Sequence, residues 1–285
     1  MWESIMECLA EDLAFPEGPV VMADGSVIVV ELLGGRVTRC WNGRTETVCE
    51  TGGGPNGAAI GPDGALWICN NGGLLPGTER GPGRIERIDL ATGRFERVYD
   101  SCDGVHLCGP NDLVFDDAGQ LWFTDNGSDH EHHRMIGGLF AARADGSQIT
   151  AINRRAISYN GIGLSPDQSH VYVADTSQAR LYRYDNCVEA QQPHYIATGI
   201  GPSGFDSLAV THGGNICIAN VFGGGITTVT PDGQVSVLPI PEEYYVTNIA
   251  FGGEDMRDAY ITLSGSGKLV RMRWEEPGLR LAFNG

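Results

Sequence analysis

Six short stretches of the chain each present one carboxylate or carboxamide at the same place, just ahead of an apolar run. The six residues are Glu17, Asn56, Asn111, Asn160, Asp206 and Asn248. In the fifth stretch, Asp206 follows the glycine-rich segment 201–204 and begins the apolar run that ends at Val210. A charged side chain at the start of a buried strand is costly unless a partner compensates it. We therefore expect the six side chains to lie together.

Side chains with these oxygen atoms, gathered at one point, would form a site for a hard divalent cation. Two carboxylates held close together repel each other unless a proton or a cation lies between them. Oxygen atoms of Asp, Glu and Asn suit Ca²⁺, Mg²⁺ or Mn²⁺. Such a metal polarises a carbonyl or phosphoryl oxygen, and a neighbouring carboxylate can act as general base. Alternatively, each residue serves a local turn, but six in register favour a shared site.

The elements that must position these residues form an internal repeat. Each polar residue is followed by an apolar strand, a turn such as 61–64, and a second strand rich in aromatic and β-branched residues, such as 66–70. A third strand follows, and an outer fourth strand is expected in segments such as 95–99. Successive polar residues are 39 to 55 residues apart, which is typical of propeller blades. The sequence predicts an all-β, six-bladed β-propeller with four-stranded antiparallel blades around a metal-binding channel, as one domain over residues 1–285.

Ring closure and two long loops complete the predicted architecture. We expect residues 4–9 to pair with residues 279–283 of the last blade, because closure removes an open sheet edge. The loops 71–82 and 126–137 both follow a second strand, so they should lie on one rim, around the channel mouth. The His-rich run in the second loop lacks helical HExxH spacing, which favours a solvated or lid-like segment over a zinc site. We expect His130 of this loop to contact the substrate.

The composition argues against several kinds of partner. A net charge of −17 with a single lysine, Lys268, disfavours nucleic acid and anionic membranes, and no apolar run reaches the roughly 18 residues of a membrane-spanning helix. Residues 1–7 lack the regions of a secretory signal.

The eight cysteines have no CxxC spacing, so we expect a reduced, cytoplasmic protein, while a pairing of Cys102 with Cys108 stays open. A monomer or homodimer acting on a small molecule is predicted.

Four motifs give the chain a resemblance to a known family. They are Phe15-Pro16-Glu17-Gly18-Pro19, Pro110-Asn111-Asp112, Asn160-Gly161-Ile162 and Gly204-Phe205-Asp206. Over nearly the whole chain and in this order, they resemble the gluconolactonase/regucalcin (senescence marker protein) family, six-bladed propellers that hydrolyse lactones with a divalent metal. The resemblance implies one metal ion, Ca²⁺ first, with Zn²⁺, Mn²⁺, Mg²⁺ or Fe²⁺ as alternatives.

The same resemblance implies roles for individual residues. Glu17, Asn160 and Asp206 match the metal ligands. The catalytic residues would be Asp206, as general base, and Asn111, which matches a residue that contacts the substrate or a metal-bound water. We expect the substrate site to include Asn111 and four further residues, namely Asp112, Asn56, Asn248 and His130.

One position departs from the family pattern. Sugar-lactone members often carry an arginine two residues before the asparagine that matches Asn111, and here that residue is Gly109. The guanidinium fork suits polar recognition of hydroxyl groups. Its absence, together with the apolar pairs Leu74-Leu75 and Val221-Phe222 near the predicted rim, favours a less polar substrate.

The predicted activity is that of a metal-dependent hydrolase that opens the ester bond of a lactone, either a sugar lactone or a less polar cyclic ester. The metal would polarise the carbonyl and stabilise the developing oxyanion. The alternatives are a phosphotriesterase of the diisopropylfluorophosphatase type, a propeller that binds a metal or ligand without catalysis, and a lyase or condensing enzyme related to strictosidine synthase. Fold alone does not separate them, because propellers host many functions.

Overall fold

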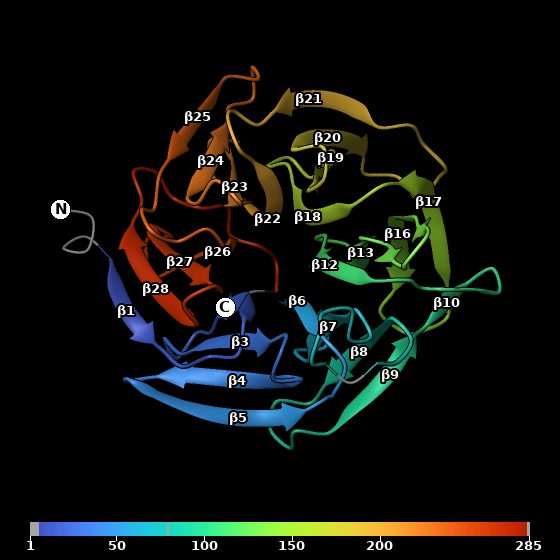
Figure 1. Ribbon diagram of the computed structural model, residues 1–285, viewed down its shortest axis with the longest axis horizontal. Coiled ribbons are helices and arrows are strands. Elements are labelled where there is room, and N and C mark those ends of the chain that lie inside the picture. The colour runs from blue at the N-terminus through green and yellow to red at the C-terminus, as the bar shows by residue number, and fades with distance from the viewer. Residues whose placement is uncertain (1–5, 79, 284–285) are drawn as a thin grey trace.

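The computed structural model describes residues 6–78 and 80–283, which form six four-stranded antiparallel sheets around a central axis (Figure 1). The predicted six-bladed β-propeller is therefore confirmed. In the first five blades the strands follow chain order from the axis outward. The described residues contain no helix, and hence no helical segment that would cross a membrane.

The strands of each blade have the following bounds, from the inner to the outer edge. Blade 1 contains β2 (Pro16–Val21), β3 (Val27–Glu31), β4 (Arg36–Trp41) and β5 (Arg44–Glu50), and blade 2 contains β6 (Pro55–Ile60), β7 (Leu66–Asn70), β8 (Arg84–Ile88) and β9 (Phe95–Tyr99). Blade 3 contains β12 (Pro110–Phe115), β13 (Gln120–Asp125), β16 (Gly137–Arg143) and β17 (Ile149–Ala156), and blade 4 contains β18 (Tyr159–Leu164), β19 (His170–Asp175), β20 (Arg180–Asp185) and β21 (His194–Thr198). Blade 5 contains β22 (Gly204–Val210), β23 (Ile216–Val221), β24 (Ile226–Val229) and β25 (Val235–Leu238), and blade 6 contains β26 (Val246–Gly252), β27 (Asp258–Leu263), β28 (Lys268–Arg273) and β1 (Glu7–Ala10). Two short ribbons, β10 (Ser101–Cys102) with β11 (Val105–His106) and β14 (Ser128–Asp129) with β15 (Arg134–Met135), lie in loops.

Aspartates close the hairpins between the inner and second strands. In blade 2, the Asp63 carboxylate accepts a hydrogen bond from the N–H of Ala65 at 3.2 Å, and Gly64 has the left-handed φ of 75° that the turn requires. In blade 3, Asp116 accepts a bond from the N–H of Ala118 at 3.0 Å. Such side-chain bonds to nearby backbone stabilise tight turns. They explain why an aspartate recurs in this turn in blades 1 to 4.

The apolar core lies between neighbouring blades. Trp67 on β7 and Trp122 on β13 are fully buried, and Tyr172 on β19 is nearly so. The Trp67 ring meets the ring of Phe115, on the inner strand of the next blade, edge-on with centroids 5.6 Å apart. This repeated packing confirms the core role predicted for these aromatic residues.

Ring closure uses a different strand pair from the one predicted. β1 forms the outer strand of blade 6 and pairs antiparallel with β28, where Glu7 lies opposite Arg271. The predicted partner, residues 279–283, forms no strand, so that part of the prediction is wrong. Ser4 and Ile5 of the predicted N-terminal strand lie outside the described residues.

The C-terminal segment has another role. The last strand, β28, ends at Arg273, and the chain beyond it leaves blade 6 and crosses one end of the channel (Figure 1). Its apolar side chains enter cores between blades: Leu281 packs beside Val114 and Tyr159, and Phe283 meets the Phe115 ring edge-on at 6.2 Å. The apolar residues of this segment are thus buried between blades and not paired in a sheet.

All eight cysteines lie in the part of the chain that the structure describes, and each is a free thiol. Cys102 is buried and Cys108 is partly buried, and the two are not joined. Burial raises the pKa of Cys108 to about 11 and that of Cys217 to about 12. These thiols therefore stay protonated at neutral pH and act as small apolar groups.

Candidate active site

A β-bulge lies at the predicted site residue of each blade. In blade 2, the two residues Asn56 and Gly57 of β6 oppose the single residue Cys69 of β7. The same mismatch occurs at Asn160 in blade 4 and at Asp206 in blade 5, and the register also shifts at this level in blades 1, 3 and 6. A bulge bends a strand and re-aims its side chains. Here it directs the polar side chain into the channel.

Glycine directly after a site residue lets neighbouring inner strands approach closely. A Cβ atom on Gly57 would lie 2.5 Å from the Cα of Asp112, in blade 3. A Cβ on Gly161 would lie 2.4 Å from the backbone oxygen of Asp206, in blade 5. Only glycine permits such contacts, and this proximity brings the site residues of successive blades together.

A ring of buried polar residues at the ends of the second strands holds the segments that lead into the site. In blade 3, Asp125 accepts bonds from the N–H groups of Cys108 at 2.7 Å and Gly109 at 2.8 Å, just before Asn111. The equivalent residues, with the groups they accept from, are Glu31 with the N–H of Ala14, Asn70 with the N–H of Gly54, Asp175 with the hydroxyl of Ser158, and Asn220 with the N–H of Gly204. We did not assign these positioning residues from the sequence. Their sequence signal is a polar residue that ends the buried second strand in five repeats.

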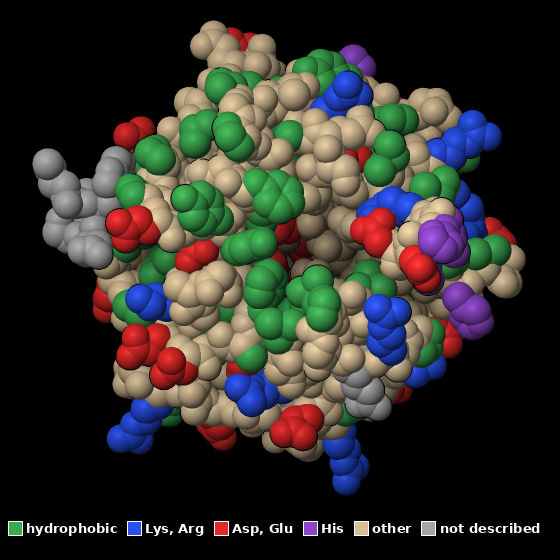
Figure 2. Space-filling model, viewed as in Figure 1, with side chains coloured by type: hydrophobic (Ala, Val, Ile, Leu, Met, Phe, Trp, Pro, Cys, Tyr) green, Lys and Arg blue, Asp and Glu red, His purple; other side chains and the backbone are tan. Residues whose placement is uncertain are grey.

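The structure brings six of the eight predicted site residues to one cavity of about 610 Å³ at one mouth of the channel. They are Glu17, Asn56, Asn111, Asn160, Asp206 and His130. The loops 71–82 and 126–137 both contribute to its rim, which confirms that they lie on the same face. Figure 2 shows this opening at the centre of the face.

The carboxyl groups at the floor of this cavity are buried close together, so their ionisation is energetically unfavourable. The pKa of Glu17 is raised to about 8, mainly by burial and also by the nearby Asp112 carboxylate, against a 3.2 Å hydrogen bond from the Asn248 amide that lowers it. Burial and the Glu17 charge raise the pKa of Asp206 well above its usual range. Neighbouring carboxylates can both stay ionised only if a cation compensates them.

The donor set fits a hard cation. The Oδ1 atoms of Asn111 and Asn160 are buried and accept no hydrogen bond within the protein, whereas the Asn160 amide group donates to Thr176 at 3.1 Å. A buried oxygen without a partner is unusual in native proteins. Among the described residues, no group of three or more His, Cys, Asp and Glu side chains has the arrangement of a metal site. A cation here would therefore depend on Asn160 in addition to Glu17 and Asp206.

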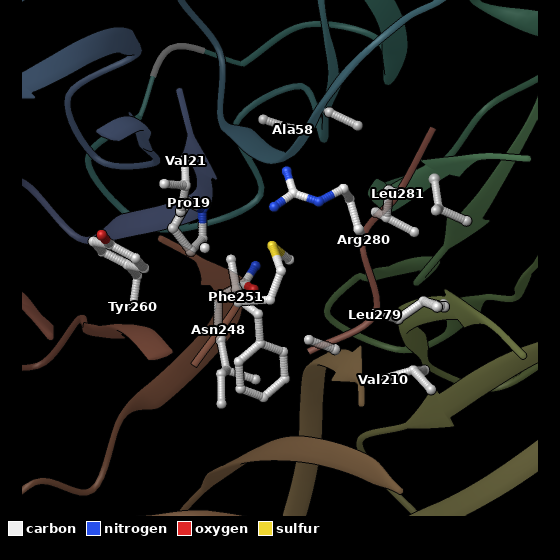
Figure 3. Close-up of a pocket in the computed structure, with 18 of the residues that line it drawn as sticks. Pro19, Val21, Ala58, Val210, Asn248, Phe251, Tyr260, Leu279, Arg280 and Leu281 are labelled. Carbon is white, nitrogen blue, oxygen red and sulfur yellow. The ribbon is translucent and has the colours of Figure 1, made fainter. Parts of the chain in front are cut away.

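Two predicted substrate-binding residues face the other side of the channel. Asp112 and Asn248 line a second cavity of about 450 Å³ at the opposite end. Figure 3 shows this cavity, with Asn248 among apolar side chains and Arg280 reaching in from the C-terminal segment. Because Asn248 donates a hydrogen bond to Glu17, its position favours orienting that carboxylate over contacting a substrate.

The His-rich loop is a folded hairpin that overhangs the active-site cavity. Its ribbon, β14 with β15, is fixed by Arg134, which pairs with Asp129 at 2.6 Å and donates to the backbone oxygen of Ile157 at 2.8 Å. The rings of His130 and His133 stack with centroids 4.6 Å apart. His130 lines the cavity as expected, and its contact with substrate stays a prediction.

Comparison with known proteins places this site in a family. The profile of the SMP-30/Gluconolactonase/LRE-like region matches residues 15–265. The chain belongs to this family. The match spans all the strands that carry the cavity residues, and it confirms the resemblance found in the four motifs.

Individual relatives agree with the SMP-30/gluconolactonase assignment. The gluconolactonase of Zymomonas mobilis is 24% identical over 303 residues, covering 94% of this chain and 81% of its own. A gluconolactonase structure from Xanthomonas campestris has a TM-score of 0.77 at 22% identity, over 94% of this chain and 89% of that one. Regucalcin from Agrobacterium tumefaciens, described as a calcium-binding protein, has a TM-score of 0.73 at 20% identity over 94% and 95%. The relatives support lactone hydrolysis as the activity at family level.

Proposed function

We propose that the protein is a divalent-metal-dependent lactonase whose cation is held by Glu17, Asn160 and Asp206. The observation that carries the proposal is the pairing of two buried carboxylates with a buried, unpartnered amide oxygen at the floor of an open cavity. Ca²⁺ suits these oxygen donors best, and the regucalcin relative is described as calcium-binding. When bound, such a cation would polarise the carbonyl of a cyclic ester and favour a developing oxyanion.

The chain's own residues would supply the proton transfer and the orientation. Asp206 would take the proton of the attacking water as general base, a role worth about 10² to 10⁴ in rate. The unpartnered Oδ1 of Asn111 faces the same cavity and would accept a hydrogen bond from that water or from a substrate hydroxyl. The buried Asp125 fixes the backbone just before Asn111, so this acceptor would be held in place before substrate binds.

The test is lactone opening by purified protein that has been stripped of metal and then refilled with Ca²⁺, Mn²⁺, Zn²⁺, Mg²⁺ or Fe²⁺. Proton release in a pH-stat reports the ring opening. Activity lost on stripping and restored by one cation supports the proposal, with metal affinity measured separately by calorimetry. Tight binding of a cation without opening of any lactone would contradict it, and hydrolysis of a phosphofluoridate under the same conditions would then favour a phosphotriesterase.

A further inference from the structure

One side of the active-site opening is formed by apolar and aromatic side chains. Figure 2 shows hydrophobic groups gathered around the central opening. The apolar residues that line the cavity include Phe15, Leu32, Leu74, Leu75, Phe222 and Tyr245. Phe222 and Tyr245 are 56% and 44% exposed. Large aromatic groups exposed together at a cavity mouth indicate a surface that contacts an apolar partner.

Two of these aromatic residues stand in strained backbone conformations next to the proposed metal ligands. Phe222 has a φ of 72° and Phe15 a φ of 60°, a region that bulky side chains rarely adopt. Phe15 lies two residues before Glu17, and its ring meets that of Tyr245 edge-on at 6.0 Å. Strain of this kind persists where the surrounding structure imposes it, and it clusters at functional sites.

The Phe222 ring lies directly over the strand that carries the proposed base. A Cβ atom on Gly204 would fall 2.7 Å from the Phe222 ring, so this ring packs on the backbone two residues before Asp206. The Phe222 N–H also donates to the backbone oxygen of Tyr244 at 2.8 Å. The backbone of Phe222 is therefore held in place, and its ring lies against the strand that carries Asp206.

On the far side of the cavity, an apolar side chain lies against position 109, where sugar-lactone members of the family often carry an arginine. A Cβ atom on Gly109 would lie 2.8 Å from Cδ1 of Leu74 and 2.5 Å from the backbone oxygen of Gly127. A long cationic side chain at position 109 would need both groups to move. Leu74 instead places a methyl group against Gly109, two residues before Asn111, and both Leu74 and Asn111 line the cavity.

We propose that Phe222 and Tyr245 on one side of the cavity and Leu74 on the other form apolar walls that select lactones with an alkyl or aryl substituent on the ring, over polyhydroxylated sugar lactones. This specificity rests on the proposed lactonase function. The lactone ring would lie over Glu17 and Asp206, and its substituent would extend along the Phe222 ring. Burial of each methylene group against such a wall adds to transition-state binding.

The experiment compares δ-decalactone, δ-valerolactone and D-glucono-δ-lactone with the metal-loaded protein. The first two share a ring and differ by one pentyl chain. We expect kcat/KM for δ-decalactone to exceed that for the other two by about tenfold or more. Phe222→Asn removes the ring but keeps a residue that tolerates positive φ, so its Tm should equal or exceed that of the parent. It should lower the decalactone-to-valerolactone ratio roughly fivefold.

Tyr244→Asn is the matched control. Tyr244 is 66% exposed and does not line the cavity, so this variant should leave all three rates unchanged. Similar rates for the three lactones in the parent, or an unchanged ratio in Phe222→Asn, would overturn the specificity but leave the lactonase proposal standing. Failure to open any of the three would overturn both.

Discussion

The metal-free protein should lose stability as pH rises, and Glu17→Gln should remove much of this loss. Glu17 is buried, and its pKa is raised from 4.5 to about 8 mainly by that burial. A carboxyl group whose pKa is higher in the folded state favours folding fully below its unfolded pKa, and this contribution is lost as pH rises through the folded pKa. The relevant window therefore runs from about pH 4.5 to pH 8.

The expected size follows from the same shift. Each pKa unit corresponds to about 1.4 kcal/mol, so full ionisation of Glu17 costs on the order of 4 to 5 kcal/mol of unfolding free energy in the metal-free protein. For a chain of this length, 1 kcal/mol changes Tm by roughly 2 °C. The fall in Tm between pH 5 and pH 9 should hence be smaller in Glu17→Gln, by roughly 8 to 10 °C.

The assay is thermal unfolding in a chelator, from pH 5 to pH 9, for the parent and the variant. Glu189→Gln, which changes an exposed carboxylate, serves as control and should leave the pH dependence as it is. Saturating Ca²⁺ should flatten the parent curve, because a bound cation favours the ionised carboxylates. Parallel curves for the parent and Glu17→Gln would refute the reasoning.

Three further predictions concern the site and its supports. Asp206→Asn should lower kcat for a lactone at least about a hundredfold while far-UV circular dichroism stays unchanged; near-parental turnover would exclude Asp206 as base. Arg84→Met should cost about 3 to 5 kcal/mol in urea unfolding, because it leaves Glu86, paired at 2.5 Å, as a lone buried charge. The double variant with Glu86→Met should recover most of that loss, and no recovery would contradict the pairing argument. Asp125→Ala should lower kcat more than it changes KM, since Asn111 loses its backbone support; a change in KM alone would argue against this positioning role.

The blade architecture was predictable from the sequence because each repeat carries its own local signals. The Asp-Gly turns, the buried second strands and the polar residue at each bulge recur in every blade or nearly so, and the observed outer strand β9 has the predicted bounds. The convergence of Glu17 and Asp206 followed from that repetition. Their burial and mutual repulsion were also expected from the sequence, but the extent of both required coordinates, because it depends on how closely neighbouring strands approach.

Other features depended on contacts that no local pattern encodes. We expected residues 279–283 to supply the closing partner because closure removes an open sheet edge, but the sheet of blade 6 ends at Arg273 and Leu281 packs against an apolar cluster of blades 3 and 4. Asp112 was predicted to bind substrate together with Asn111, as part of the Pro110-Asn111-Asp112 motif. Alternate residues of a strand point to opposite sides, and Asp112 accordingly faces the second cavity.

The closure of blade 6 has a consequence for how the molecule folds. Its outer strand comes from the N-terminus and its other three strands from the C-terminus, so Glu7 must find Arg271 across almost the whole chain. Contacts this distant in sequence make folding slow. During synthesis, β1 must wait with an unpaired edge until β28 has left the ribosome, and an exposed edge invites association with other chains. A nascent chain that stops short of Arg273 would therefore keep an open ring. The edge of β1 is paired only after β28, the last strand synthesised, has formed.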